Sequence, residues 1–172
     1  MTDPVIRAER PEDIDAIRRV LVAAFGQPDE AGLVDKLRSH GQAAVSLVAE
    51  ERGEVVGHIL FSPVAYHHHD RVYPGMGLAP LAVGPAFQGR GIGSRLVEEG
   101  LARGRAAGAA FVVVLGEPAY YGRFGFRPAM ALGILSEYEA GEAFMVLELQ
   151  AGGLPPAGGL VKYAREFADL AE

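Results

Sequence analysis

The feature that most constrains this chain is a strand, a glycine-rich turn, a helix and a second strand that follow one another between Leu78 and Leu115. The last of these, Phe111 to Leu115 (FVVVL), is a continuous apolar run. A strand without alternating polar positions is typical of a parallel strand that is covered on both faces. The segment is therefore predicted to be a right-handed βαβ crossover.

Hydrophobic periodicity and turn residues predict further elements on both sides of this crossover. Strands are expected at Val5–Glu9, Val45–Glu51, Val55–Val64, Leu78–Val83 and Ala143–Leu149, and helices at Pro11–Phe25, Pro28–His40, Ser94–Ala107 and Pro118–Phe124. A polar loop is expected at His67–Pro74 and a Gly/Pro-rich loop at Ala151–Gly159, and the type of Leu160–Phe167 stays open. The predicted fold class is α/β (α+β), with a mixed sheet of about six or seven strands and helices on both faces.

Length and composition narrow the classes of protein to which the chain can belong. Its 172 residues fit one domain spanning 1–172 and can bury a sizeable core. The absence of cysteine excludes a disulfide framework, a thiolate nucleophile and a cysteine-ligated metal. The net charge of −6 argues against a nucleic-acid binder. No secretory signal or membrane-length apolar run is visible, so we expect a cytoplasmic protein without a membrane partner.

The turn inside the crossover reads Gln88-Gly89-Arg90-Gly91-Ile92-Gly93-Ser94. Glycines let backbone N–H groups crowd around an anion, and the N-terminus of the following helix adds positive potential. A pyrophosphate is therefore the expected ligand. A Walker loop does not fit, because Arg90 and Gly91 stand where it needs Lys and Ser or Thr. The dinucleotide pattern GxGxxG fails in both registers.

The pattern that fits the turn is (Q/R)xxGx(G/A), with Gln88, Gly91 and Gly93 at its fixed positions. A second motif, YxxxGF, matches Tyr121 to Phe126 (YGRFGF) on the far side of the crossover. With Leu81-Ala82-Val83 ahead of the turn, these motifs resemble the GNAT superfamily of acyl-CoA-dependent N-acetyltransferases. The resemblance covers most of the chain, and the two motifs together are much more specific than either alone.

The resemblance implies that the strand at Leu78–Val83 splays from its parallel neighbour to admit the pantetheine arm of acetyl-CoA. Pro80 is consistent with a broken ladder there, because proline has no N–H to donate. The Leu81 N–H would face the thioester carbonyl as a catalytic donor, and the stretch from Leu81 through Ala82 to Val83 would bind the cofactor with its backbone. The pyrophosphate would be held by the turn, at Gln88, Gly89, Arg90, Gly91, Ile92, Gly93 and Ser94. The side chain of Arg90 is a candidate phosphate contact.

The implied reaction is direct attack of a neutral amine on the acetyl thioester, which needs two proton transfers. Tyr121 matches the family's general acid, and Tyr120 is expected to pack. Better-known members carry a His or a carboxylate two or four residues before the oxyanion donor, whereas this chain has Ala79 and Gly77 there. The general base is therefore Glu117 or a water molecule, or the chain has no general base.

Two function classes stay open. The first is an enzyme that acetylates a primary amine of a small molecule or peptide, and the second is a binding module that senses acetyl-CoA without turnover. Tyr121 favours the enzyme, because a pure binder needs no proton donor there. A homodimer, which the late strand and tail could support, also stays open. His67–His69 is expected in a solvated loop, with a part in amine recognition as the alternative. No metal site is expected there, because consecutive side chains point to opposite sides.

Overall fold

The structure is a computed structural model that describes residues 3–138 and 140–169. Its strands are β1 (Val5–Ala8), β2 (Val45–Glu51), β3 (Glu54–His68), β4 (Arg71–Val83), β5 (Phe111–Leu115), β6 (Arg127–Pro128), β7 (Ile134–Ser136), β8 (Phe144–Glu148) and β9 (Gly159–Lys162). Its α-helices are α1 (Ile14–Phe25), α2 (Asp29–Ser39), α3 (Ile92–Ala106) and α4 (Pro118–Tyr121). Within this part of the chain, no helix is both long and apolar enough to cross a membrane.

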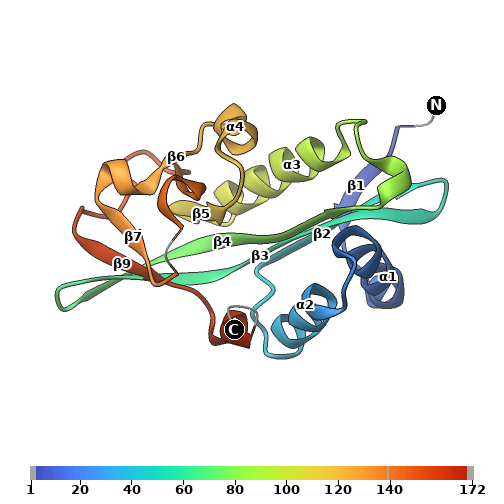
Figure 1. The fold of residues 1–172 in the computed structure, drawn as a ribbon, viewed down its shortest axis with the longest axis horizontal. Helices are drawn as coiled ribbons and strands as arrows, with labels where there is room; N and C mark the ends of the chain where they lie inside the picture. The colour runs from blue at the N-terminus through green and yellow to red at the C-terminus, as the bar shows by residue number, and fades with distance from the viewer. Residues whose placement is uncertain (1–2, 139, 170–172) are drawn as a thin grey trace.

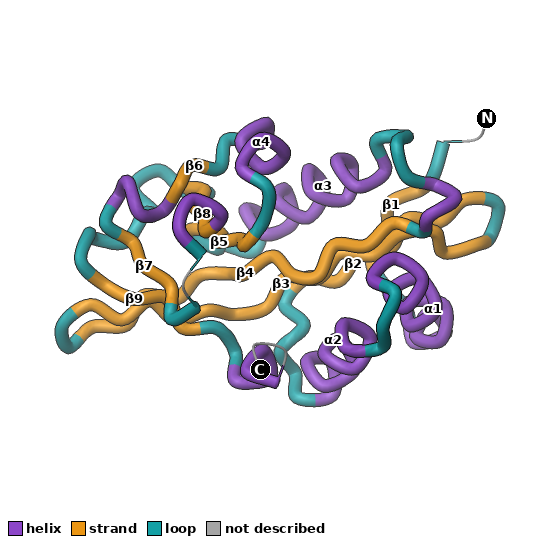
Figure 2. Tube along the Cα trace, in the orientation of Figure 1, coloured by secondary structure: helices purple, strands orange, loops and turns teal. Residues whose placement is uncertain are grey.

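The strands form one mixed sheet that runs along the whole molecule (Figure 1). Its main path follows the order β1-β2-β3-β4-β5-β8-β6, and β9 joins β3 and carries β7. The pairs β4–β5 and β7–β9 are parallel, and the others are antiparallel. Helices α1 and α2 cover one face and α3 and α4 lie on the other (Figure 2). The predicted mixed sheet with helices on both faces is confirmed.

The two faces of the sheet carry separate parts of the core. Phe61 on β3 packs on the α3 side with Leu96 and Val97, whereas its neighbour Leu60 packs on the other side with Leu21. This follows from the alternation of side chains along a strand. Helix α3 lies so close to the sheet that a Cβ on its Gly100 would come within 2.3 Å of the Phe61 ring. The crossover β4–α3–β5 is thereby fixed tightly to the sheet.

Strands β4 and β5 pair along only part of their length. Their parallel register joins Met76 to Val112, Gly77 to Val113 and Leu78 to Val114, and it ends there. Beyond Leu78, strand β4 pairs only with β3 on its other edge, and this register is interrupted at residues 79–80 and resumes from Leu81 to Val83. Since a strand between two neighbours normally bonds to both, half of the backbone groups in this stretch have no strand partner. The predicted splay around Pro80 is confirmed.

The polar loop predicted at His67–Pro74 is wrong. Strand β3 continues to His68 and β4 begins at Arg71, so the segment is a long hairpin with a two-residue turn. The turn at His69 takes a φ of 55°, without the Gly or Asn that usually marks such a site. Pairing of β3 with β9 at residues 65–67 supports the extended conformation. Tertiary pairing therefore overrides the polar composition of the segment.

The segment Leu160–Phe167, whose type the sequence left open, divides into two parts. Its first residues belong to β9, and a 3-10 turn follows at Arg165–Asp169. Figure 2 shows the described C-terminal end close to α2, on the face opposite α3. Phe167 in this turn is buried in the same core cluster as Leu33 of α2. The end of the chain therefore contributes side chains to the region where β4 and β5 separate.

Candidate active site

Two clefts meet where β4 leaves β5. The first, here called the turn cleft, has a volume of about 520 Å³ and is lined by Leu81, Val83, Phe87, Gln88, Gly89, Gly91, Ile92, Gly93, Ser94, Tyr120 and Arg123. The second, here called the strand cleft, has a volume of about 770 Å³ and is lined by Phe25, Glu30, Leu33, Leu78, Ala79, Pro80, Leu81, Leu115, Tyr121, Glu137, Tyr138 and Phe167. Leu81 lines both, so the two clefts adjoin at this residue.

The turn cleft is formed mostly by backbone. Gly89 and Gly91 take φ values of 77° and 80°, which favour glycine, and α3 begins directly after them at Ile92. The first N–H groups of a helix have no acceptor within the helix, and the helix dipole adds positive potential at the same end. A Cβ at either glycine would meet no atom within 4 Å, so the space beside the turn is open. The geometry suits a phosphate group.

The predicted cofactor residues do not all face this cleft. The Gln88 side chain donates from Nε2 to the Val83 carbonyl oxygen at 3.0 Å and so ties the turn to the end of β4. The Ala82 side chain is buried on the α1 face, so only its backbone is available to a ligand. Arg90 does not line the turn cleft, because it forms an ion pair with Glu51 of β2. The expected phosphate contact from its side chain stays a prediction, and it would require Arg90 to leave Glu51.

Arg123 supplies positive charge to the turn cleft, and the sequence analysis did not single it out. It lies on the 3-10 turn after α4, with its guanidinium 5.2 Å from the centre of the Tyr120 ring. Its Nη2 donates to Ser94 Oγ at 3.2 Å. The Tyr120 hydroxyl lies 3.3 Å from the same Ser94 oxygen. Tyr120 therefore packs, as expected, and also presents its hydroxyl to the turn.

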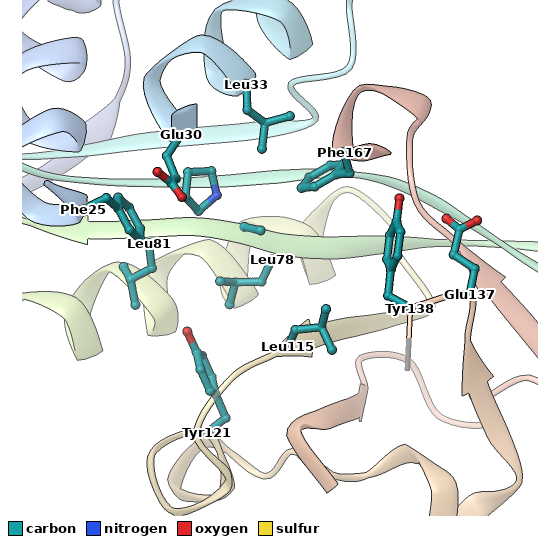
Figure 3. A pocket seen from close by; sticks show the side chains of 12 residues that line it. Phe25, Glu30, Leu33, Leu78, Leu81, Leu115, Tyr121, Glu137, Tyr138 and Phe167 are labelled. Carbon is teal, nitrogen blue, oxygen red and sulfur yellow. The ribbon is translucent and has the colours of Figure 1, made fainter. Parts of the chain in front are cut away.

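The neighbouring Tyr121 faces the strand cleft. Its side chain is 9% exposed, and its ring packs against Gly116, where a Cβ would come within 2.3 Å. Figure 3 shows its hydroxyl directed up toward Leu81, in the region where the two clefts join. Burial, with a smaller contribution from Tyr120, raises the pKa of Tyr121 to about 12. The hydroxyl is therefore protonated at neutral pH.

The positions two and four residues before Leu81, which hold the general base in better-known members, carry no titratable group in this chain. Ala79 lines the strand cleft with a methyl group, and the space beside Gly77 is filled by the ring of Tyr163, to which a Cβ at residue 77 would come within 3.0 Å. Glu117 is exposed and lines neither cleft. Two carboxylates that the sequence did not single out, Glu30 and Glu137, do line the strand cleft.

No signal in the sequence joins these two glutamates. Glu30 lies in the first turn of α2, and Glu137 directly follows β7, a strand of three residues. Tyr138 and Phe167 reach the same cleft from near the end of the chain. Only the tertiary fold brings these segments together.

The histidine segment lies outside both clefts. His67 and His68 end β3 at the tip of the hairpin, at the far end of the sheet from the turn cleft (Figure 1). The rings of His68 and His69 lie 4.2 Å apart. Among the described residues, no group of three or more His, Asp or Glu side chains is arranged to hold a metal ion. A part for this segment in amine recognition finds no support.

Comparisons with known proteins agree with this geometry. The family model described as "Acetyltransferase (GNAT) domain" matches residues 5–129. The Escherichia coli N-acetyltransferase YhbS is 39% identical over 165 residues, which cover 95% of this chain and 98% of that protein. The crystal structure of YhbS in complex with CoA has a TM-score of 0.90 and 36% identity, covering 98% of this chain and 93% of that one. A Brucella melitensis GNAT acetyltransferase in complex with acetyl-CoA has a TM-score of 0.78 and 40% identity, covering 95% and 97%.

The family match spans the crossover, the glycine-rich turn and the YxxxGF motif, on which the resemblance in the sequence was based. The relatives match nearly the whole chain, including the strands beyond residue 129. Sequence, fold and comparisons lead to the same conclusion: the chain belongs to the GNAT acetyltransferase family.

Proposed function

We propose that this chain transfers the acetyl group of acetyl-CoA to a primary amine. The observation that carries the proposal is the junction of the two clefts at Leu81. The glycine-rich turn, which suits a phosphate group, lies on one side of this residue, and a cleft lined by leucines, two glutamates and the largely buried Tyr121 lies on the other. A donor substrate with a long arm and a separate acceptor can meet only at such a junction.

Acetyl-CoA is the donor that fits the turn cleft best. Its pyrophosphate would accept hydrogen bonds from backbone N–H groups between Gln88 and Ser94, with Arg123 as a charged contact. Its pantetheine arm would lie along the unpaired edge of β4, where the backbone from Leu81 to Val83 lacks a partner on the β5 side. The relatives crystallised with CoA and acetyl-CoA support this assignment.

The reaction forms one bond and breaks one bond. The amine nitrogen attacks the thioester carbonyl, the new C–N bond forms, and the C–S bond breaks to release CoA. The carbonyl oxygen gains negative charge on the way, and the Leu81 N–H is the proposed donor to it. A positioned backbone donor of this kind typically contributes a few kcal/mol to the transition state. An ammonium first loses one proton to become the neutral nucleophile, and the nitrogen loses a second proton as the amide forms. Both protons pass to water in the open strand cleft, since Glu117 lines neither cleft.

Tyr121 is the proposed general acid. The CoA sulfur leaves as a thiolate and must gain a proton, and the Tyr121 hydroxyl remains protonated at neutral pH. The apolar surroundings that raise the pKa of Tyr121 also disfavour a thiolate anion, so they raise the proton affinity of the sulfur as well. The pKa of the Tyr121 hydroxyl and the pKa of the CoA thiol are thus both raised.

The test is release of free CoA thiol from acetyl-CoA in the presence of a panel of primary amines, with mass spectrometry of the acetylated product. We expect amine-dependent thiol release by the wild-type chain. If the chain binds acetyl-CoA by calorimetry but releases no thiol with any amine, the acetyl-transfer proposal is wrong. The chain would then be a binding module for acetyl-CoA.

A further inference from the structure

The charged side chains that line the strand cleft are both carboxylates. Of its twelve lining residues, two are glutamates, and none of those described is a lysine, arginine or histidine. Glu30 is half-buried and accepts a hydrogen bond from Gln27 Nε2 at 3.1 Å. Glu137 is exposed, and its Oε1 accepts a hydrogen bond from the backbone N–H of Tyr163 at 2.8 Å. Neither glutamate forms an ion pair with another described residue.

The two carboxylates stand at opposite ends of the cleft. Figure 3 shows Phe25, Glu30 and Leu81 at one end, and Tyr138, Glu137 and Phe167 at the other. Tyr121 lies below the first end, on the side of Leu81. The proposed reaction therefore takes place at the Glu30 end, and Glu137 is separated from it by the length of the cleft.

The surface between the two glutamates is apolar. Leu33, Leu78 and Leu115 point into the cleft there, and Leu115 is 43% exposed. An exposed leucine at the end of a buried strand loses contact with water only when a ligand covers it. At the Glu137 end, the rings of Tyr138 and Phe167 add aromatic faces, which attract cations in addition to the carboxylate.

We infer that the acceptor is a dication: a primary amine joined by an apolar segment to a second positively charged group. This inference rests on the proposed acetyl transfer and specifies its substrate class. The reacting ammonium approaches the junction at Leu81 beside Glu30. The apolar segment covers Leu78 and Leu115. The second cation is held by Glu137 and the ring of Tyr138, and these two residues determine specificity.

The same charges act against other amines. An amino acid with a free carboxylate would place its negative charge beside a glutamate, with no cationic side chain described in the cleft to compensate it. Desolvating an unpaired charge and placing it near a like charge both oppose binding. A simple monoamine would bind Glu30 but leave Glu137 solvated. Its binding free energy would include no contribution from Glu137 and Tyr138 at the other end of the cleft.

The experiment uses acceptors that share one chain length and differ only at the distal end. An α,ω-diaminoalkane carries an ammonium there, the matching alkylamine a methyl group, and the matching ω-amino acid a carboxylate. Thiol release from acetyl-CoA gives kcat/KM for each. We expect the diamine to exceed the monoamine by about fivefold, as one partly exposed ion pair allows, and the amino acid to be the poorest acceptor. Equal values for the diamine and the amino acid would overturn the inference.

Two variants locate the effect within the cleft. Glu137→Gln keeps the carbonyl acceptor for the Tyr163 N–H and removes only the charge, so it should lower kcat/KM for the diamine about fivefold and for the monoamine less than twofold. Glu30→Gln should lower both alike, because each acceptor places an ammonium there. Glu142→Gln, an exposed glutamate outside the cleft, is the matched control for charge. An equal loss for both acceptors in Glu137→Gln would contradict the inference.

A binding measurement separates failure of this inference from failure of the proposed function. Calorimetry of the same acceptors in the presence of CoA needs no turnover. Tighter binding of the diamine that depends on Glu137, without thiol release, would retain the ligand class and reject acetyl transfer. Thiol release without any preference among the distal groups would retain acetyl transfer and reject the dication.

Discussion

The two clefts that meet at Leu81 are formed in different ways. The turn cleft comes mainly from one continuous stretch, residues 81–94, and its working groups are backbone N–H groups fixed by two glycines and the start of α3. The strand cleft takes side chains from α1, α2, β4, β5, α4 and the segments around β7 and β9. In the proposed function, the turn cleft would bind its ligand by backbone conformation, and the strand cleft would bind its ligand by the identity of its side chains.

This difference indicates which part of the molecule is common to the family and which is particular to this chain. A backbone site tolerates changes at most of its positions as long as the glycines remain. A side-chain site changes its ligand with single substitutions. The donor site is therefore expected to respond to changes of conformation, and the acceptor site to changes of charge and shape.

The largest effect is expected at Gly91. Gly91→Val forces a branched residue to a φ of 80° and places its side chain where the phosphate would lie. The variant should lose about two hydrogen bonds from the turn to the charged phosphate. We therefore expect calorimetry to show acetyl-CoA binding at least about 100-fold weaker than that of the wild type. The matched control is Gly108→Val, at the other end of α3, with a φ of 87° and the same open surroundings. It should lose stability through backbone strain and keep its affinity, and equal affinities for both variants would exclude the turn as the donor site.

The next effect separates two adjacent tyrosines. Tyr121→Phe keeps the ring and removes the proton donor, so kcat should fall by about 10²–10⁴-fold while acetyl-CoA affinity changes little. Because the pKa of Tyr121 is raised to about 12, deprotonation of its hydroxyl should not lower the wild-type kcat until the pH approaches that value. A full kcat in Tyr121→Phe would assign the proton to another donor, and a loss of affinity instead would make Tyr121 a binding residue.

A smaller effect is expected where α2 is attached to the sheet. Arg38 of α2 forms an ion pair with Glu9, which also accepts a hydrogen bond from Ser46 and lies 3.6 Å from His58. Burial raises the pKa of Glu9, but the bonds with His58, Arg38 and Ser46 outweigh burial and hold the pKa below its ordinary value. Glu9→Gln should lower the free energy of unfolding by about 2 kcal/mol at neutral pH, measured by urea denaturation.

The pH dependence of this effect has a definite sign. A carboxylate whose pKa is lower in the folded state stabilises the fold above its unfolded pKa, which is about 4.3, and loses that contribution as the pH falls further. The stabilities of wild type and Glu9→Gln should therefore converge in acid. Glu12→Gln, at an exposed position, is the control and should follow the wild type. If the difference in the free energy of unfolding between wild type and Glu9→Gln were the same at all pH values, packing and not charge would hold α2 on the sheet.

The smallest effect is expected at Tyr120. Its hydroxyl lies beside Ser94 in the turn cleft, so Tyr120→Phe should weaken acetyl-CoA binding about two- to fivefold and leave kcat nearly unchanged. This pattern is the reverse of that expected for Tyr121→Phe. If both variants had a lower kcat and an unchanged affinity for acetyl-CoA, the two tyrosines would not act in different clefts. The proposed distinction between the two clefts would then be wrong for these residues.

The sequence predicted the parts of the fold that depend on local patterns. The continuous apolar run of β5, the glycines of the turn and the helix between them placed the crossover correctly, and Pro80 indicated the splay. Strands β6, β7 and β9 were missed because they have two to four residues and show no readable alternation. The hairpin around His69 was missed because its polar residues suggested a loop, whereas β3 and β4 pair up to the turn and β9, nearly a hundred residues later in the chain, pairs with β3 there.

The site divides in the same way. The turn residues and Tyr121 were found from motifs, because their positions are fixed relative to one another along the chain. Glu30 and Glu137 have no such relation, and only the packing of α2 and of the segment after β7 around β4 brings them into one cleft. Arg90 shows what a motif does not predict: its position in the turn suggested a phosphate contact, and the structure pairs its guanidinium with the carboxylate of Glu51 on β2.

The open edge of β4 between residues 79 and 83 would also link the lifetime of the protein to its supply of donor, if acetyl-CoA binds there as proposed. A strand edge without a neighbour leaves backbone groups to water and offers a template for unwanted pairing with other chains. Acetyl-CoA in this gap would occupy that edge, and a ligand present at one hundred times its dissociation constant adds about 2.7 kcal/mol to the stability of the folded state. Cells low in acetyl-CoA would then hold less of the folded protein, because the empty form is the one exposed to aggregation and proteolysis.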